Sequence, residues 1–181
     1  LANGLFEADQ NEEALSVQEA GLAMKRRLGV SEESILVAQT NLASMYQRLG
    51  RTEEALRIER DVYSGRLKLH GEIHERTLSA ALNYASSLVE LEHFEEANSL
   101  MRKTTPVARR VLGEQHRLTL KMRWSYAAAL CKDPGATLDD LRESVTTLEE
   151  TARIMRRVLG DAHPLTDEVG GVLLRARAIL D

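Results

Sequence analysis

The sequence has few of the features that mark secreted or membrane proteins. It contains one cysteine, Cys131, so no disulfide can form within the chain, which is typical of a reducing compartment. No apolar run approaches the roughly 20 residues that a membrane-spanning helix requires, and no signal peptide is recognisable. We therefore expect a cytoplasmic, intracellular protein without a membrane partner. The first residue is Leu rather than Met, which predicts that the chain is a fragment of something longer.

Prolines and aromatic residues are scarce as well. The 181 residues include three prolines, and only 4% are aromatic, whereas Ala, Leu, Glu and Arg dominate. This composition is typical of long, uninterrupted helices rather than of a β-sandwich. The formal net charge is −4 and charges of both signs are interleaved, so no basic surface for nucleic acid is expected.

Motifs of the common enzyme classes are missing. The sequence has no glycine-rich phosphate loop, no His-Glu-x-x-His and no nucleophile in a recognisable turn. Cys131 has no nearby base in the sequence, so no nucleophilic role is expected for it. Carboxylate pairs such as Glu53-Glu54 recur at expected helix starts, where the helix dipole explains them. We expect no enzymatic activity, no cofactor and no metal site.

What the sequence does contain is a repeat. Three segments carry Gly, then His three residues later, then Thr three further: LHGEIHERTL (69–78), VLGEQHRLTL (111–120) and VLGDAHPLTD (158–167). Their glycines are spaced by 42 and 47 residues, and Gly29 opens a weaker copy 42 residues before the first. The segment TNLASMYQRLGRTEEAL (40–56) aligns with LNYASSLVELEHFEEAN (82–98) at the same offset of 42. Such self-similarity is typical of repeat architectures.

The Gly-x-x-His-x-x-Thr box could be a metal or catalytic motif, or the turn between two helices. The copies lie a full repeat apart, whereas a zinc site needs four converging ligands. In the last copy Pro164 falls in the expected first helical turn, where its missing N–H costs nothing. We therefore interpret the box as a turn in which Gly113 ends one helix and His116 caps or packs against the next.

Each unit is predicted to be a pair of helices. Apolar and small residues recur at helical spacing in the first helix, which ends near Gly50 in one copy. The second helix begins with acids and ends with cations, and Thr52 and Thr137 are its predicted N-caps in two copies. Pro106 predicts a kink near Thr104 and Thr105 rather than a helix end. The turn-forming Asp-Pro-Gly in CKDPGATLDD (131–140) predicts a loop with five extra residues, near 132–136.

Paired helices with a small residue at the crossing (Ala43, Ala85, Ala127) resemble the tetratricopeptide repeat, whose ordinary period is about 34 residues. The 42-residue period, the Asn-Leu-Ala segment and the LGxxHPxT linker resemble the kinesin light chain subtype. The resemblance covers 1–181 and implies an all-α, right-handed superhelical solenoid of antiparallel helix pairs. Its expected parts are a partial first repeat (1–28), repeats at 29–70, 71–112 and 113–159, and a C-terminal capping helix (160–181).

The resemblance implies a non-enzymatic scaffold whose first helices line a concave groove for a peptide or partner segment. In kinesin light chains, inward-facing asparagines hold the backbone of the peptide, and Asn41 and Asn83 occupy the matching positions; the third unit has Ser125 there. The competing interpretation of each Asn is a buried cap on a neighbouring helix. One or two helical turns from these positions lie the other predicted groove residues: Val37, Ser44 and Arg48, then Ser79, Ser86 and Glu90, then Lys121, Ala128 and Lys132.

The basic residues among these predict a preference for an acidic partner segment. Trp124 shares a helical stripe with Leu120, Ala127 and Cys131, so we expect it in the core rather than as a binding anchor. The alternative to peptide binding is an architectural segment of a larger signalling or NTPase protein. In that case the groove has no tight ligand, and the exposed repeat ends allow self-association.

Overall fold

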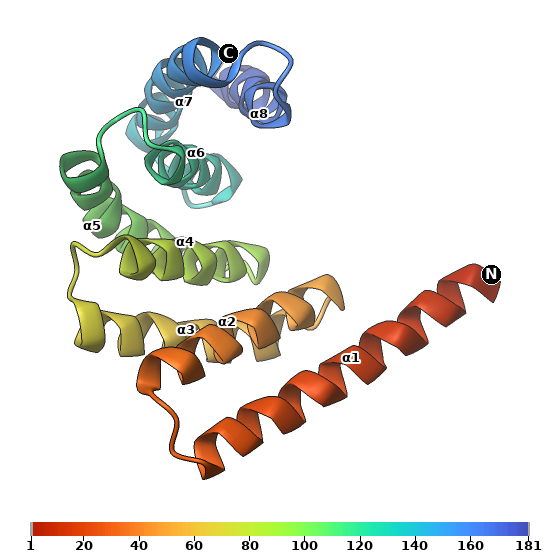
Figure 1. The fold of residues 1–181 in the computed structure, drawn as a ribbon. Helices are drawn as coiled ribbons and strands as arrows, with labels where there is room; N and C mark the ends of the chain where they lie inside the picture. The colour runs from red at the N-terminus through yellow and green to blue at the C-terminus, as the bar shows by residue number, and fades with distance from the viewer. Residues whose placement is uncertain (1, 181) are drawn as a thin grey trace. The chain divides into compact units, whose positions relative to one another are not determined.

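A computed structural model describes residues 2–180, with side chains from residue 12 onward, and these residues form eight α-helices (Figure 1). They are α1 (Ala2–Arg27), α2 (Glu32–Arg48), α3 (Thr52–His70), α4 (Glu75–Glu90), α5 (Phe94–Leu112), α6 (Arg117–Lys132), α7 (Leu138–Leu159) and α8 (Pro164–Leu180). No strand occurs between residues 2 and 180, and the predicted all-α fold class is confirmed. The expected outer limits of the array, residues 1 and 181, lie outside the described residues.

The helices form two compact units, Leu1–Gly71 and Glu72–Asp181. In the first unit α2 packs against both α1 and α3. Its core joins Leu15 and Leu22 of α1 to Leu42 and Tyr46 of α2 and to Ala55 of α3. The apolar positions on α2 follow the helical spacing of the sequence, so one face of this helix is buried.

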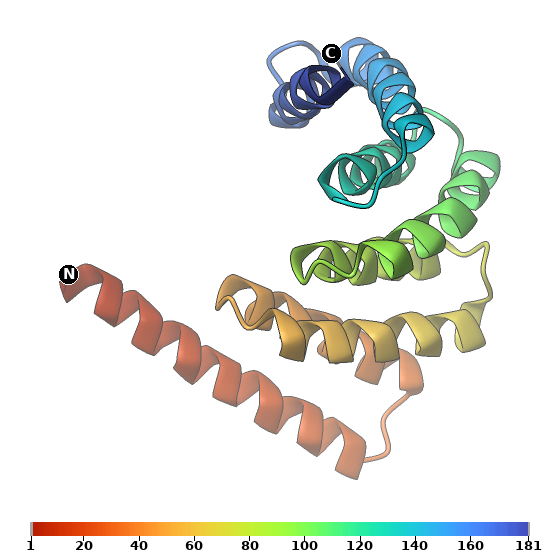
Figure 2. The ribbon, with the colours of Figure 1, turned by 180° about the vertical axis from the view of Figure 1, so that it is seen from behind.

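In the second unit α4, α6 and α8 lie side by side as one layer, and α5 and α7 form the other (Figures 1 and 2). The middle helix, α6, contributes to two cores. Met122 and Tyr126 pack with α4 and α5, whereas Leu120 and Ala127 pack with α7 and α8. Alternating helices of this unit therefore share a layer, as stacked helix pairs require.

The Gly-x-x-His-x-x-Thr box is a helix-capping turn, as predicted. Its glycines follow the last residues of α3, α5 and α7 with φ of 80°, 92° and 91°. Each histidine Nδ1 accepts a hydrogen bond from the backbone N–H two residues later, at 3.1, 3.3 and 3.2 Å for His74, His116 and His163. The Thr119 hydroxyl donates to the carbonyl of Ala108, at 3.3 Å, and so ties α6 to α5. These turn, capping and packing contacts account for the Gly, His and Thr of the box.

Of the two predicted threonine N-caps, one is confirmed and one is wrong. Thr137 forms a full capping box with Asp140 at the start of α7. Thr52, in contrast, is the first residue of α3, and its N-cap is Arg51. The reason is that the Arg51 N–H already bonds to the carbonyl of Tyr46, at 2.9 Å, in the turn that ends α2. That bond places the start of α3 one residue earlier than the sequence suggested.

The remaining local expectations concern Pro106 and the turn after α6. Helix α5 continues through Pro106, so the prediction that no helix ends there is confirmed, while the kink stays a prediction. Residues 133–137 join α6 to α7. In this turn the N–H of Gly135 donates to the Asp133 carboxylate at 2.8 Å.

The turn after α4 predicts a stabilising substitution. Glu92 is held at φ 61°, in the left-handed region, at the repeat position where Gly50 has φ 72°. Two backbone hydrogen bonds of the turn fix this conformation. The Glu92 N–H donates to the Val89 carbonyl at 3.2 Å, and the His93 N–H donates to the Leu88 carbonyl at 2.8 Å. A residue with a Cβ is strained there, whereas glycine is not.

We expect Glu92→Gly to raise the free energy of unfolding of the second unit by about 1 kcal/mol. Urea titration followed by the fluorescence of Trp124, the one tryptophan, measures this. Glu92→Ala is the matched control, since it removes the same charge but keeps the Cβ, and it should leave stability nearly unchanged. Equal stabilisation by both variants would mean that the charge, and not the backbone, is responsible.

Candidate functional site

A cavity of about 250 Å³ lies between α4 and α6 in the second unit, and we call it the α4–α6 groove. Its polar lining consists of Ser86 and Glu90 from α4 and Ser125 and Lys132 from α6. Its apolar lining consists of Ala85, Val89, Met101, Trp124, Ala128 and Ala129. Ser86 and Ala128, like Glu90 and Lys132, are 42 residues apart, so equivalent repeat positions of two first helices face the same space.

The structure brings five of the twelve predicted groove residues together in this groove: Ser86, Glu90, Ser125, Ala128 and Lys132. Ser79, Asn83 and Lys121 lie on the same two helices, outside the groove lining. The other four are exposed on α2, in the first unit: Val37, Asn41, Ser44 and Arg48. The groove described by the structure is therefore built by the second unit alone.

The two asparagines are exposed rather than buried. Asn83 on α4 and Asn41 on α2 both present their side chains to solvent. The competing interpretation, in which each is a buried cap on a neighbouring helix, is therefore wrong. An exposed carboxamide has a donor and an acceptor to offer an extended peptide backbone.

Trp124 contributes to the core and also lines the groove. Its partly buried ring packs against the core of α6, α7 and α8, as predicted. It lines the α4–α6 groove too, and its indole N–H is buried with no acceptor within the described part of the chain. Sequence reasoning missed this second contact, because a stripe at helical spacing cannot show that a large ring reaches two surfaces. The one available signal was its position next to Ser125.

Cys131 has the properties of a structural thiol. Its Sγ lies 2.9 Å from the Ser144 Oγ, and that hydroxyl bonds in turn to the Ala127 carbonyl at 2.7 Å. Burial raises the pKa of the Cys131 thiol, so the neutral form is favoured at neutral pH. A raised pKa disfavours the thiolate that nucleophilic chemistry requires.

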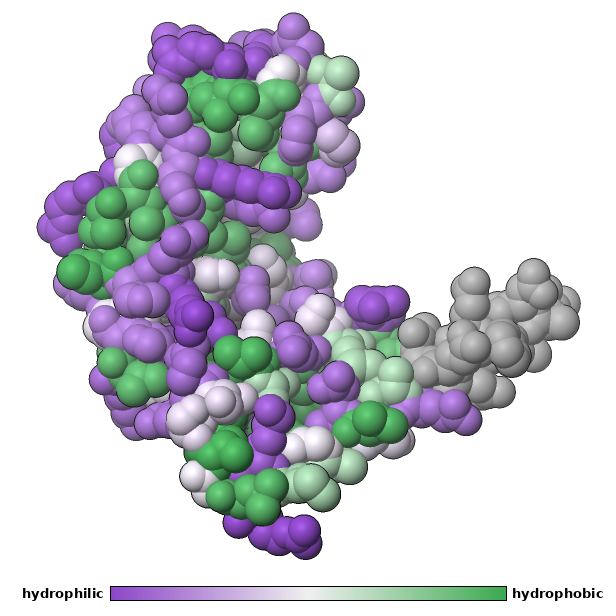
Figure 3. Space-filling view, viewed as in Figure 1, coloured by the Kyte–Doolittle hydropathy of each residue, from purple (hydrophilic) through white to green (hydrophobic). Residues whose placement is uncertain are grey.

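The groove has a mixed charge. Lys132 of α6 and Glu90 of α4 line it together, and Lys121 lies further along α6. Over the second unit, the space-filling view shows hydrophilic side chains interleaved with smaller apolar patches (Figure 3). The groove can therefore select a ligand by charge as well as by shape.

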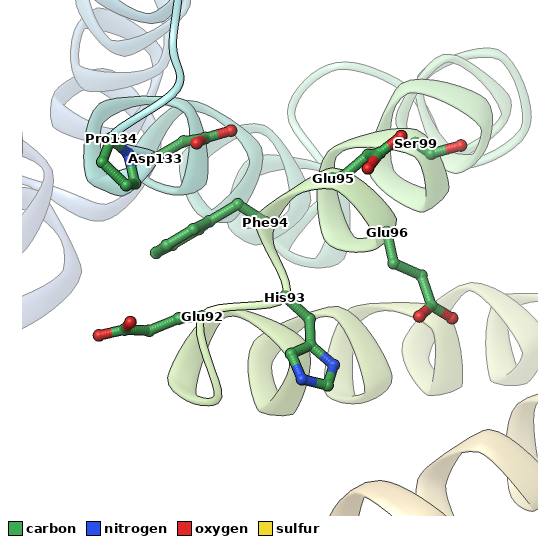
Figure 4. A pocket seen from close by; sticks show the side chains of 8 residues that line it. All are labelled: Glu92, His93, Phe94, Glu95, Glu96, Ser99, Asp133 and Pro134. Carbon is green, nitrogen blue, oxygen red and sulfur yellow. The ribbon is translucent and has the colours of Figure 1, made fainter.

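A second, acidic cleft of about 700 Å³ lies at the turn between α4 and α5, next to the turn after α6. It is lined by Glu92, His93, Phe94, Glu95, Glu96, Ser99, Asp133 and Pro134 (Figure 4). The carboxylates of Glu92, Glu95 and Glu96 point in different directions, and the Tyr84 hydroxyl donates a hydrogen bond to the Glu96 carboxylate. These carboxylates do not converge on one point as a cation site would require.

The described residues contain no group of His, Cys, Asp or Glu side chains that could hold a metal ion. None of the described helices is long and apolar enough to cross a membrane.

Comparison with known proteins identifies the class of this chain. Residues 34–110 match the family model described as tetratricopeptide repeat. Two crystal structures described as Podosopora anserina kinesin light chain nearly identical TPR-like repeats have similar folds. Both are 23% identical, with TM-scores of 0.79 and 0.72, and they cover 98% and 99% of this chain and 82% and 91% of their own. No curated protein matches the sequence.

A third similar structure is BtubC (BKLC) from P. vanneervenii, at 16% identity and a TM-score of 0.72, covering 95% of this chain and 71% of that one. The chain is therefore an all-α helical repeat protein. More particularly, residues 34–110 match the tetratricopeptide repeat, and the resemblance to the kinesin light chain subtype is confirmed at the level of the fold. Repeats of this class generally mediate protein–protein interaction, and the fold is typically a non-catalytic scaffold.

Proposed function

We propose that the α4–α6 groove binds an extended segment of a protein partner, so that the chain acts as a non-enzymatic interaction scaffold. The supporting observation is the groove itself, in which equivalent positions of two first helices enclose about 250 Å³. Such a volume suits one side chain rather than a drug-sized ligand, which takes at least about 300 Å³. The apolar lining would hold that side chain, and the hydroxyls of Ser86 and Ser125 would bond to the neighbouring peptide groups.

Asn83 is the proposed contact to the backbone of the partner segment. It is exposed on α4, one helical turn before Ser86, which lines the groove. Its carboxamide can donate to a peptide carbonyl and accept from a peptide N–H. Asn41 has the equivalent repeat position on α2 and is equally exposed, so we assign it the same role within its own unit.

We further propose that the bound segment is acidic where it passes α6. Lys121 and Lys132 are both on this helix, and Lys132 lines the groove. Glu90 lines the groove as well and opposes this preference. Replacing Glu90 by Gln should therefore tighten the binding of an acidic segment, because one repulsive charge is removed.

The test is a selection of the 181-residue chain against a peptide library. We expect wild type to enrich a consensus, and Asn83→Leu to weaken binding of the consensus peptide at least about tenfold, since a backbone contact made by two hydrogen bonds is lost. Ser99→Leu is the matched control, because Ser99 is exposed on α5 and lies outside the groove. The proposal fails if nothing is enriched, or if the two leucine variants bind equally well.

One observation favours the architectural alternative. Helix α1 exposes the apolar residues Val17 and Met24, seven residues apart on one face, and Leu28 in the turn just after the helix is exposed as well. A second copy of the chain, or a further repeat, would cover this face. A chain that enriches no peptide and sediments as a dimer would favour this alternative over the groove.

A further inference from the structure

A cavity of about 200 Å³ between α5, α6 and α7 of the second unit is lined by three arginines, and we call it the arginine cavity. Arg102 and Arg109 come from α5 and Arg123 from α6. The rest of its lining is Met101, Thr105, Pro106, Tyr126, Glu143, Thr147 and Glu150. It is a separate space from the α4–α6 groove, with which it shares only Met101 among the residues that line both.

The centre of this cavity is a buried charge that the other copies of the repeat lack. Arg123 is 4% exposed, and the preceding copies have Ala81 and Gln39 at its position. Its partner Glu150 is equivalent to Lys103 of the preceding copy, at an offset of 47. Both members of the pair therefore differ from the residues at the same positions in the preceding copy, so the arginine cavity is found only in this one of the compared copies.

The partners of Arg123 and Arg109 are half-exposed carboxylates, whereas Asp140, which pairs with Arg102 at 2.6 Å, is 23% exposed. An Nη of Arg123 donates to Glu150 at 2.5 Å, and the Glu150 side chain is 49% exposed. Arg109 pairs with Glu114 at 2.6 Å, and that carboxylate is also about half exposed. A half-exposed carboxylate keeps contact with water, so it can rotate away from its arginine without losing all of its solvation. The buried guanidinium of Arg123 cannot leave.

Two hydroxyl groups of the cavity add to the arginines: that of Tyr126 positions the Arg102 guanidinium, and that of Thr105 can donate a hydrogen bond. Arg102 donates through Nε to the Tyr126 hydroxyl at 2.8 Å, and that hydroxyl donates to Glu143 at 2.9 Å. The Thr105 hydroxyl is buried, with the residue 7% exposed, and within the described residues it has no hydrogen-bond partner. The adjacent Thr104 hydroxyl, in contrast, bonds to the Leu100 carbonyl at 2.8 Å. A buried hydroxyl without a partner is destabilising, so Thr105 points to a ligand that supplies an acceptor.

We propose that the arginine cavity binds a small tetrahedral oxyanion of the phosphate type. Arg123 is its buried anchor, Thr105 supplies a further donor, and the Glu150 carboxylate occupies the oxyanion position until the ligand displaces it. Guanidinium groups match phosphate geometry, and each has five N–H donors. Donors on two helices, α5 and α6, surround the cavity from more than one side, which suits a tetrahedral ion better than a planar carboxylate. The proposal is independent of peptide binding in the α4–α6 groove.

The test is a titration of the 181-residue chain with inorganic phosphate at constant ionic strength, followed by NMR of the arginine side-chain N–H groups. We expect saturable binding that Arg123→Met weakens at least tenfold, because the anchor is lost. Glu150→Gln should tighten binding several-fold, since it removes the competing carboxylate. Arg110→Gln is the matched control, because Arg110 is exposed on α5 and outside the cavity lining.

Thr105→Val separates a ligand contact from a structural role. Valine keeps the shape and removes only a hydroxyl that has no partner, so Tm in phosphate-free buffer should be unchanged or higher. Phosphate affinity should nevertheless fall several-fold. This variant and Glu150→Gln also keep the test decisive if Arg123→Met fails to fold.

The competing outcomes are distinct. A response that does not saturate, or that is equal in Arg123→Met and Arg110→Gln, overturns the proposal, and so does acetate binding as tightly as phosphate. Free phosphoserine distinguishes the source of the oxyanion. If it binds as well as phosphate, the cavity takes a phosphorylated group, and if only inorganic phosphate binds, the cavity takes the free ion; both outcomes support the site.

Discussion

Replacing Leu148 by alanine should lower the free energy of unfolding of the second unit by about 3 kcal/mol. Leu148 lies on α7, is fully buried, and belongs to the core that α7 forms with α6 and α8. Its truncation removes apolar contacts and leaves a cavity among residues from three helices, which cannot all collapse into the space. Urea titration followed by Trp124 fluorescence measures this loss of unfolding free energy, because the Trp124 ring packs against the same core.

The control for this prediction is on the same helix. Leu138 is the first residue of α7 and is exposed, so Leu138→Ala makes the same chemical change without opening a core cavity. We expect it to alter stability by no more than about 0.5 kcal/mol. Equal losses from the two variants would show that helix propensity, rather than the core, explains the effect of Leu148→Ala.

The fold was predictable because three features of the repeat indicate the same structure. The period, the helical spacing of apolar residues and the Gly-x-x-His-x-x-Thr box all indicate helix pairs, and the structure has α4–α5 and α6–α7 where they indicate them. The start of α3 was not predictable to the residue. Thr52 and Arg51 compete for the cap, and the local backbone bond from the Arg51 N–H to the Tyr46 carbonyl decides between them.

The candidate groove was predictable in part, for the same reason. Counting helical turns from the asparagine positions put Ser86, Ser125 and Lys132 on the same side of their helices, and all three line the groove because equivalent positions of stacked helices face one space. Composition and spacing could not show that Trp124 reaches this space from the core side. Counting along the helices also put Glu90 at a groove-facing position, and it lines the groove together with Lys132.

The arginine cavity was overlooked for a different reason. Arg109 is one of the cations that the helix dipole explains, Arg102 and Arg123 lie in the middle of their helices, and sequence alone does not reveal that Arg123 is buried. A usable signal was nevertheless present. The preceding copies have Ala81 and Gln39 at the position of Arg123, and Ala81 is fully buried. A charge at a position that is uncharged in the preceding copies is the pattern to look for in other repeat arrays.

Replacing Glu150 by alanine should lower the free energy of unfolding of the second unit by about 2 kcal/mol. Loss of one partner of a fully buried ion pair costs about 3–5 kcal/mol, because the other charge is left uncompensated. The expected loss is smaller here, since the Glu150 side chain is 49% exposed and water can reach part of the site. Urea titration followed by Trp124 fluorescence measures this loss.

Glu149 is the matched control: it pairs with Arg177 at 2.6 Å, but both side chains are about half exposed. Glu149→Ala should therefore cost no more than about 0.5 kcal/mol.

A double variant identifies the source of the loss. If the cost of Glu150→Ala comes from the uncompensated guanidinium of Arg123, then Arg123→Met combined with Glu150→Ala should recover most of the stability, because no buried charge remains and an apolar chain fills the space. If the double variant is instead less stable than either single variant, the pair stabilises the fold by its own attraction. In that case the Glu150 carboxylate is a fixed part of the structure rather than a group that an oxyanion can displace. The cycle therefore measures how firmly Arg123 and Glu150 hold each other, and this strength sets the affinity that a ligand of the arginine cavity can reach.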